Sequence, residues 1–354
     1  MTVSAGCATG IKAPSTSPYK KEQVVTSLIF ILLSLLVLLI VELAYMPIAR
    51  RNGWVAYRKR EGRPATVIGG GIIFYLGMVL WSLGMALIYN TDPPGAYFII
   101  GLTMLALTSF ADDVVRLPVW IRLVVQFVAA FFLCFAFVPM FHNPLVVLLY
   151  LVVVVGFVNG YNFMDGINGI TAAYSVVVLG VLLYLDLMVI RFASGSFIAI
   201  ALGSALIFGI FNFRKHALAF AGDVGSISMG FIISTLLTQY CISQNNIFGL
   251  VMVSVYMIDT FATILRRIFE GENIFRTHHK HIYERMFFVW KVPQLVISSA
   301  YAILQLGISI GYLFLSTYQE RLIYFFVVFG SLIILYVIMM ILTERRIKKR
   351  SLKR

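Results

Sequence analysis

Long apolar runs separated by short polar loops occupy most of this chain. Runs of about 17–24 apolar residues have the length of a helix that crosses the hydrocarbon core of a bilayer. The pattern predicts an all-α, polytopic membrane protein of about eleven transmembrane helices. We place these helices at 25–48, 68–89, 96–111, 120–140, 144–160, 169–189, 196–212, 226–243, 247–265, 292–316 and 321–343.

The composition is typical of a membrane protein. Of 354 residues, 60% are hydrophobic and only 12% are charged, and the mean hydropathy is +0.93. These values exclude an ordinary soluble domain. The three cysteines, Cys7, Cys134 and Cys241, have neither the spacing of zinc ligands nor that of a disulfide framework.

The basic residues gather on one side of the predicted helices. A net charge of +13 could indicate nucleic acid, but in a membrane protein Lys and Arg set the orientation, and we expect no nucleic-acid partner. Of the 28 basic residues, the other side holds only Lys12, Lys20, Lys21, Arg191 and Arg321. The positive-inside rule then places the N-terminus outside and the C-terminus in the cytoplasm, as an odd number of helices requires.

This orientation gives the chain three parts. Residues 1–21 form a short flexible extracytoplasmic tail without the apolar core of a signal peptide, so the first helix acts as an uncleaved anchor. Residues 22–343 form a single transmembrane catalytic domain. Residues 344–354 form a basic cytoplasmic tail.

The most informative polar stretch is Gly156–Thr171, GFVNGYNFMDGINGIT, between two apolar runs. Asn159, Asn162 and Asp165 are spaced by three, so on a continuing helix they lie on one side. A carboxylate with carboxamides at the end of a membrane helix is costly unless it binds something. The alternative is a polar loop that only caps the helix.

A second motif, SFADDVVRLPVWIRLVVQ, covers residues 109–126. The adjacent carboxylates of Asp112 and Asp113 repel each other, so a cation is their natural partner. Oxygen ligands suit Mg²⁺ or Mn²⁺, especially when a phosphate completes the shell. The alternative is a solvated helix start, with one aspartate as N-cap and Arg116 or Arg122 in salt bridges.

Two further polar stretches contain glycines. In FAGDVGSISMG, residues 220–230, a tight turn with Asp223 leads into an apolar helix, whose N-terminus can face phosphate while the carboxylate binds its metal. A simple capping turn is the alternative. The basic run that leads into Gly69–Gly71 is a weaker indication, and contact with anionic headgroups explains it equally well.

The longest cytoplasmic loop, RRIFEGENIFRTHHKHIYER, covers residues 266–285. Arg forks and His donors of this kind suit a diphosphate. The residues concerned are Arg266, Arg267, His278, His279 and His281. Zinc is disfavoured because no acidic or Cys ligand has zinc spacing beside them. Positive-inside bias explains the arginines of this loop but not its histidines.

The acid pair, the asparagine-rich stretch, the Asp223 turn and the histidine loop all fall on predicted cytoplasmic loops or helix ends, and the opposite loops hold no comparable cluster. One site would then offer carboxylates, carboxamides, a His/Arg loop and a Gly-rich turn between bilayer and water. The chemistry that fits is metal-assisted transfer of a phosphoryl-linked group from a soluble nucleotide to a lipid phosphate.

These motifs together resemble the polyprenyl-phosphate N-acetylhexosamine-1-phosphate transferases, or glycosyltransferase family 4. The resemblance covers roughly residues 45–290. It is carried by the acid pair with Arg122, Leu123 and Gln126, by N-x-x-N-F-x-D-G-I-N-G-I from Asn159, by F-x-G-D-x-G-S from Phe220, and by H-x-x-H from His278.

The resemblance implies a Mg²⁺-dependent enzyme of the bacterial cytoplasmic (inner) membrane. Its partners would be a UDP-N-acetylhexosamine, undecaprenyl phosphate and membrane lipid. A second copy of the chain, in a homodimer, is a further possible partner. UMP would be released and an undecaprenyl-diphosphate-sugar formed.

The resemblance also implies roles for individual residues. Asp112 and Asp113 would bind metal or activate the lipid phosphate, and Asp223 would be the principal Mg²⁺ ligand. Asn162 and Asp165 would face the nucleotide diphosphate and metal, with Asn159 and Asn168 nearby. Phe220 would stack on uracil, and His278 and His281 would belong to the nucleotide-sugar loop.

Two positions depart from the family pattern, and the second bears on the pathway. The family often has Asp at the position of Asn168, which weakens any role that needs a charge there. The loop HHKHIYER resembles the H-x-x-H-x-Y form of enzymes that initiate O-antigen or capsule chains more than the three consecutive histidines of the peptidoglycan branch. We therefore favour surface-polysaccharide initiation, with phospho-MurNAc-pentapeptide transfer as the alternative.

Two further classes compete with an enzyme. A secondary transporter of an anionic solute would carry ionisable groups near the bilayer midplane and show repeated halves, neither of which is evident. A non-catalytic scaffold would leave the acidic cluster unexplained.

Overall fold

The structure is a computed structural model that describes residues 18–56, 65–89, 95–137, 143–273 and 279–351. Three features predicted from the sequence fall wholly or partly outside the described residues. These are His278, most of the two tails (1–17 and 352–354) and the basic run 57–64.

The described chain is almost entirely helical, which confirms the all-α prediction. Its elements, in chain order, are α1 (Pro18–Arg51), β1 (Val55–Ala56), β2 (Thr66–Val67), α2 (Ile72–Tyr89), α3 (Ala96–Val115), α4 (Val119–Phe137), α5 (Pro144–Phe163), α6 (Ile170–Tyr184), the π-helical turn η2 (Leu185–Val189), α7 (Gly195–Asn212), α8 (Gly222–Ser243), the 3₁₀ helix η3 (Phe248–Val253), α9 (Ser254–Phe269), α10 (Ile282–Phe288), α11 (Gln294–Leu313) and α12 (Tyr318–Ser351).

The prediction of about eleven membrane helices is confirmed for nine. Within the described ranges, nine helical segments are long and apolar enough to cross a membrane, so this is a multi-pass membrane protein. The other two, Ile72–Ile88 and Val119–Phe135, are apolar helices of somewhat smaller length. At 1.5 Å per residue each measures about 25 Å, slightly less than the roughly 30 Å of a hydrocarbon core.

Several predicted boundaries differ from the observed ones. Helix α2 begins at Ile72 rather than at 68, because the N–H groups of Gly70 and Gly71 donate to Phe220 and Ala221. The predicted ninth helix is divided between η3 and α9, and the short helix α10 was not predicted. Residues 344–351 of the predicted basic tail are the last two turns of α12.

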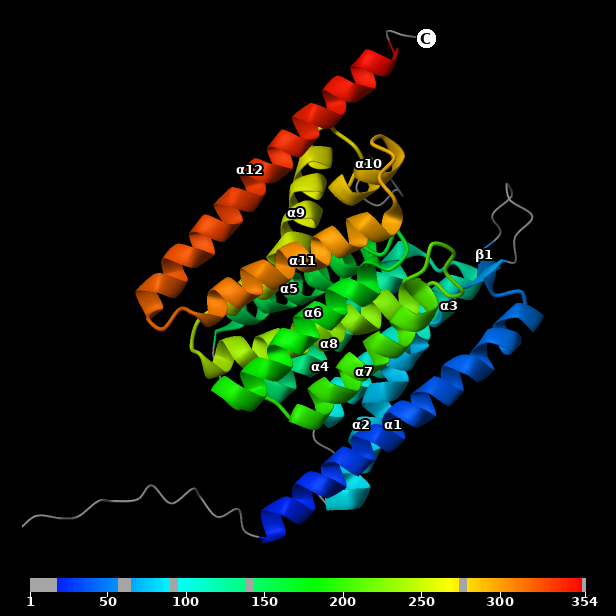
Figure 1. Ribbon diagram of the computed structural model, residues 1–354, viewed down its shortest axis with the longest axis vertical. Helices are drawn as coiled ribbons and strands as arrows, with labels where there is room; N and C mark the ends of the chain where they lie inside the picture. Colours follow the sequence, from blue (N-terminus) through cyan, green and yellow to red (C-terminus); the bar gives the residue numbers. More distant parts are fainter. Residues whose placement is uncertain (1–17, 57–64, 90–94, 138–142, 274–278, 352–354) are drawn as a thin grey trace, which may run out of the picture.

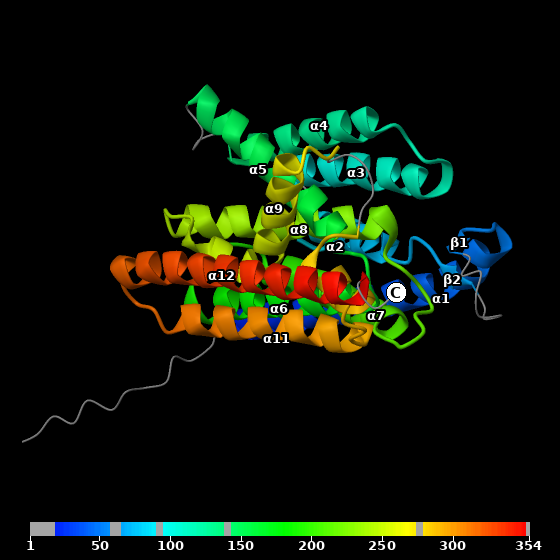
Figure 2. The same cartoon turned by 90° about the horizontal axis from the view of Figure 1, so that it is seen from above.

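Helix α8 is at the centre of the bundle. It packs against α2, α3, α5 and α6 and lies between the α3–α4 pair and the α6–α11 pair (Figures 1 and 2). Small residues permit this position, as in other membrane bundles. A Cβ on Gly225 would overlap the backbone of Gly71, and Gly230 fits against the Tyr161 side chain of α5.

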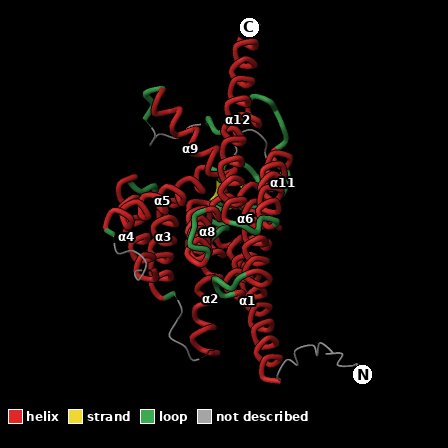
Figure 3. The backbone as a smooth tube through the Cα atoms, turned by 90° about the vertical axis from the view of Figure 1, so that its left-hand side faces the viewer, coloured by secondary structure: helices red, strands yellow, loops and turns green. Residues whose placement is uncertain are grey.

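The first and last helices lie on opposite flanks of the bundle. Helix α1 begins near the bottom of Figure 1 and α12 ends near its top, and Figure 3 shows the same arrangement. Opposite ends agree with an odd number of crossings. The upper end of α12 also holds α10, because Arg285 donates to Glu344 at 2.6 Å and the Trp290 indole donates to Thr343 at 3.0 Å.

A buried carboxylate lies in the middle of α1. Glu42 has no exposed surface, and within the described part of the chain neither of its oxygens has a hydrogen-bond partner. Its Oε1 lies against Gly70, where a Cβ would come within 2.9 Å. Burying such a group without a partner costs about 1–3 kcal/mol.

We expect Glu42→Met to raise the midpoint of thermal unfolding in detergent, because the variant removes this unpaired group and keeps most of its volume. Leu36→Met, at a half-exposed site on the same helix, should leave the midpoint unchanged. A lower midpoint for Glu42→Met would mean that Glu42 makes a stabilising contact in the intact protein.

Candidate active site

The acid pair joins two helices at one end of the bundle. Asp113, in the last turn of α3, accepts the backbone N–H groups of Asp223 at 2.9 Å and Val224 at 3.1 Å. These donors belong to the first turn of α8, whose own preceding residue, Ala221, provides no side-chain cap. A carboxylate there satisfies two free N–H groups and meets the positive end of the helix dipole.

Arg122 of α4 bridges the other two carboxylates. Its Nη1 lies 2.6 Å from Asp112 Oδ2 and 3.1 Å from Asp223 Oδ2. The second oxygen of Asp112 accepts the Leu117 N–H at 2.5 Å. Arg122 thus makes the salt bridge that the alternative reading of this motif included, but the acid pair lies at the end of α3 and not at a helix start. The three aspartates of two distant motifs share one site.

The carboxamides of α5 point to different neighbours. Asn159 exchanges hydrogen bonds with Gln126 of α4, at 2.5 and 3.3 Å. One turn later, Asn162 accepts the Ser226 hydroxyl of α8 at 2.6 Å. Both residues thus fix α5 beside the acid pair. Gln126 and Ser226 had been singled out only as motif letters, and no spacing indicated these partners.

Asp165 lies just beyond the end of α5, in the turn before α6. The Thr171 hydroxyl donates to it at 2.5 Å. Burial, assisted by the negative charges of Asp223 and Asp113, raises the pKa of Asp165 to about 7. The turn therefore brings a fourth carboxylate within electrostatic range of the other motifs.

The glycines before α2 support the Asp223 turn. Backbone bonds pair Val67 with Leu218 and Phe220, and Gly70 and Gly71 donate to Phe220 and Ala221. A Cβ on Gly222, whose φ is +70°, would come within 2.6 Å of Asp113 Oδ2. The sequence analysis did not predict this contact between the three consecutive glycines and the Asp223 turn.

Phe220 immediately precedes this turn. Its N–H donates to Val67 at 2.8 Å, and its carbonyl accepts Gly70 at 2.9 Å. The side chain is partly buried. Its stacking on a base stays a prediction.

Two arginines and one histidine of the predicted diphosphate loop pair with carboxylates of the same region. Arg266 binds Glu270 at 2.6 Å, and the buried Arg267 binds Glu272 at 3.1 Å. The exposed His279 ring lies 2.8 Å from Glu284. In this arrangement these side chains are not gathered around the aspartates.

His281 is buried rather than presented to solvent. Its ring is 2% exposed and lies 3.4 Å from Asp259 of α9. It begins α10 and, with Glu284, forms a capping box. The structure thus places His281 in the packing of α10, and its catalytic role stays a prediction.

Asn168 joins two loops as a hydrogen-bond donor. Its buried amide donates to the carbonyls of Arg214 at 3.0 Å and Lys215 at 3.3 Å. A carboxylate has no N–H to donate. This explains the departure from the family pattern, because here the position needs an amide.

The carboxylates of the site fit a divalent cation whose coordination shell the substrate would complete. Asp113, Asp165 and Asp223 concentrate negative charge, and Arg122 forms a salt bridge with Asp223. Within the described ranges, no three His, Cys, Asp or Glu side chains form a closed ligand group. Mg²⁺ commonly takes one or two carboxylates and fills its shell with water and substrate phosphates.

We expect Asn168→Asp to lower the free energy of unfolding by about 1–3 kcal/mol, since two carbonyls lose their donor and face a carboxylate. Thermal unfolding in detergent measures the change. Asn143→Asp is the matched control, because Asn143 caps α5 by accepting the Leu145 N–H, which aspartate does equally well. Equal stability of both variants would contradict the assignment of Asn168.

A second prediction concerns pH. The pKa of Asp165 is about 4 in the unfolded chain and about 7 in the folded protein. The free energy of unfolding therefore falls as the pH rises from about 4 to about 7, and the loss is complete above this interval. With metal removed by EDTA, the gain in unfolding midpoint from Asp165→Asn should therefore be larger at pH 8.5 than at pH 5, roughly as the interval predicts. An equal gain at both pH values would exclude the raised pKa.

Comparisons with known proteins agree with the motifs. Residues 96–240 match the family model described as glycosyl transferase family 4. A phospho-N-acetylmuramoyl-pentapeptide-transferase of Lactobacillus helveticus is 25% identical over 69% of this chain and 82% of its own. A probable undecaprenyl-phosphate N-acetylglucosaminyl 1-phosphate transferase of Bacillus subtilis is 26% identical over 75% of this chain and 78% of its own.

The matched region contains the acid pair, the asparagine-rich stretch and the Asp223 turn, which the structure brings together. Both named relatives belong to the superfamily that these motifs resemble. Residues 96–240 of this multi-pass membrane protein are therefore similar to glycosyl transferase family 4, and most of the chain is similar to transferases of the polyprenyl-phosphate hexosamine-1-phosphate superfamily.

Proposed function

We propose that this protein transfers an N-acetylhexosamine 1-phosphate from a UDP-sugar to undecaprenyl phosphate, with Mg²⁺, and releases UMP. The single observation that carries the proposal is an acidic site next to an apolar cavity inside the bundle. A soluble, charged donor and a lipid acceptor need such a pair of environments.

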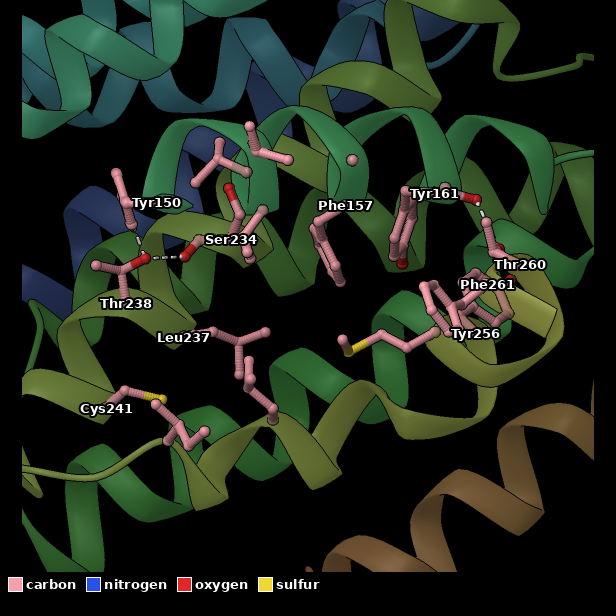
Figure 4. A pocket seen from close by; sticks show the side chains of 18 of the residues that line it. Tyr150, Phe157, Tyr161, Ser234, Leu237, Thr238, Cys241, Tyr256, Thr260 and Phe261 are labelled. Carbon is pink, nitrogen blue, oxygen red and sulfur yellow. Dashed lines mark hydrogen bonds between the residues drawn. The ribbon is translucent and has the colours of Figure 1, made fainter. Parts of the chain in front are cut away.

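The cavity has a volume of about 950 Å³ and lies between α5, α8 and η3–α9. Tyr161 and Thr260 lie at one end, and Tyr150 and Cys241 at the other (Figure 4). Apolar side chains form most of its wall, among them Val153, Phe157, Leu237, Ile242, Leu250 and Ile264.

The position of the cavity suits an isoprenoid chain. From Tyr150 to Tyr161 the helix rises about 16 Å at 1.5 Å per residue, and the next residue, Asn162, belongs to the polar site. Part of a polyprenyl tail in the cavity would leave its phosphate beside the carboxylates. Burial of apolar surface supplies about 25 cal/mol per Å² toward such binding.

The carboxylates supply the donor side of the proposal. Asp223 and Asp113 would hold the cation, with Asp165 nearby. Bound Mg²⁺ offsets the charge of the diphosphate and stabilises the leaving phosphate. Phe220 borders the same turn and is available to the uracil ring.

The reaction needs one bond made and one broken. An oxygen of the lipid phosphate attacks the β-phosphorus of the UDP-sugar, and the bridging bond to the α-phosphate breaks, so UMP carries away the electron pair. The protein's contribution is position and charge. Asn162 is held by Ser226 at the place where the lipid and nucleotide would meet.

Direct attack is favoured over a covalent intermediate on Asp112. One oxygen of Asp112 accepts the Leu117 N–H, and the other is paired with Arg122. A carboxylate with both oxygens engaged is a weak nucleophile. We assign Asp112 to holding Arg122 beside the developing charge.

The sugar and pathway are the finer part of the proposal. We favour the initiation of O-antigen, capsule or another surface polysaccharide, because of the His281-x-Tyr283 form of the loop. The relatives named above include the peptidoglycan branch, so UDP-MurNAc-pentapeptide is the alternative donor. We place the site at the cytoplasmic face of the bacterial inner membrane, on the positive-inside argument.

The test is UMP release by purified protein with undecaprenyl phosphate, Mg²⁺ and a panel of UDP-N-acetylhexosamines that includes UDP-MurNAc-pentapeptide. We expect release with one donor class, dependent on both lipid and metal. Asp223→Asn should lower kcat by at least about 100-fold while the protein stays folded, because a carboxylate that would hold the charge-stabilising cation is lost.

Glu320→Gln is the control for this substitution. It makes the same carboxylate-to-amide change at the start of α12, where Glu320 accepts the Ser316 and Thr317 N–H groups. Its UMP release should equal that of the wild type. Folded wild-type protein that released no UMP from any donor would refute the proposed function.

A further inference from the structure

Tyr283 of α10 lies on the turn that carries Asp165. Its hydroxyl donates to the Phe163 carbonyl at 2.8 Å. That carbonyl belongs to the last turn of α5, where carbonyls lack a partner within the helix. Phe163 separates Asn162 from the Met164–Gly169 turn, so the bond holds the backbone between two site residues.

Gly166 makes room for this tyrosine. A Cβ at position 166 would collide with the Tyr283 hydroxyl oxygen, and ring atoms Cε2 and Cζ would lie 3.0 Å away. Gly166 has no positive φ, so its backbone accepts a side chain. The contact with Tyr283, rather than backbone conformation, is what requires glycine.

Tyr283 is itself held from α9 and α11. Asp259 accepts the Ile282 N–H at 3.0 Å and the Tyr301 hydroxyl at 2.7 Å. The rings of His281 and Tyr283 stack with centroids 5.8 Å apart. Tyr283 is 1% exposed, so its place is fixed on all sides.

We propose that Tyr283 is a positioning residue that fixes the Met164–Gly169 turn, and with it Asp165, through the Phe163 carbonyl and the face of Gly166. The proposal deepens the proposed function and rests on it, because Asp165 belongs to the site assigned there. Among the described residues, no hydrogen bond joins the Tyr283 side chain to an aspartate. It acts only through the backbone of the turn.

Burial supports the donor role of the hydroxyl. It raises the pKa of Tyr283 well above the usual range, and the nearby carboxylates of Glu284, Asp259 and Asp165 act in the same direction. The phenol therefore keeps its proton at any ordinary pH and donates to Phe163.

The first experiment compares Tyr283→Phe with wild type by two readouts. Hydrogen–deuterium exchange should increase in peptides that cover residues 163–170. The kcat of UMP release should fall roughly 10- to 100-fold, as for a misplaced site group, with the KM for the UDP-sugar little changed. A raised KM with unchanged kcat and exchange would instead mean that Tyr283 contacts substrate, and would overturn the proposal.

Tyr324→Phe is the matched control. It removes a phenol hydrogen bond of the same length, 2.8 Å, to the Ile308 carbonyl between α12 and α11. Exchange over residues 163–170 and kcat should equal those of the wild type. If the two variants changed exchange and kcat equally, the Tyr283 effect would reflect a general loss of rigidity of the helix bundle, and the proposal would be contradicted.

The second experiment is a suppressor test. Gly166→Ala should be severely impaired because its methyl group meets the Tyr283 oxygen. Gly166→Ala with Tyr283→Phe should recover part of the loss, since that oxygen is gone. Gly180→Ala, with no atom within 4 Å, should gain nothing from Tyr283→Phe. A double variant no better than Gly166→Ala alone would refute the contact.

The experiments distinguish failure of the proposed transferase function from failure of the positioning role of Tyr283. Exchange and the thermal midpoints of the four Gly166/Tyr283 variants report on the contact even if the wild type releases no UMP. Normal wild-type turnover with exchange, kcat and midpoints unaffected by Tyr283→Phe would overturn the positioning role and leave the proposed function standing.

Discussion

Two backbone N–H groups donating to one carboxylate hold this site together. Asp113 is at the end of one membrane helix and caps the start of another, and the bundle centre is built on that second helix. In a bilayer, free N–H groups at a helix end cost several kcal/mol each if left without a partner. Capping therefore places Asp223, and the Gly69–Gly71 segment bonded to its turn, beside the acid pair.

The need of buried polar groups for partners also explains the positions of the other polar residues of the site. Asn159 and Asn162 are each held by a side chain from a different helix, and Arg122 spans two aspartates. Every such bond lies at the end of the bundle where α3 and α5 finish and α8 begins. A site made of helix ends has the free backbone groups, the polar side chains and the access that a charged donor needs.

The sequence predicted the helices well because long apolar runs leave few alternatives in a membrane. It also identified the aspartates, since carboxylates at such positions are costly. It could not predict partners across the bundle. Asn168 and Asp165 looked alike as polar residues near glycines, yet the first donates to two carbonyls and the second accepts the Thr171 hydroxyl and has a raised pKa. The seven-residue α10 has too few turns to show a periodicity, so the burial of His281 and the position of Tyr283 were not foreseeable.

The contact between α12 and α10 has a consequence for biosynthesis. Glu344 and Thr343 hold Arg285 and Trp290, and α10 in turn rests on the end of α5. During translation α12 leaves the ribosome after every other element of the site. The aspartates can assemble while the chain is still being inserted, but α10 obtains its last support only when α12 has entered the membrane. A nascent chain arrested before that helix would hold the acidic cluster and lack the brace behind it.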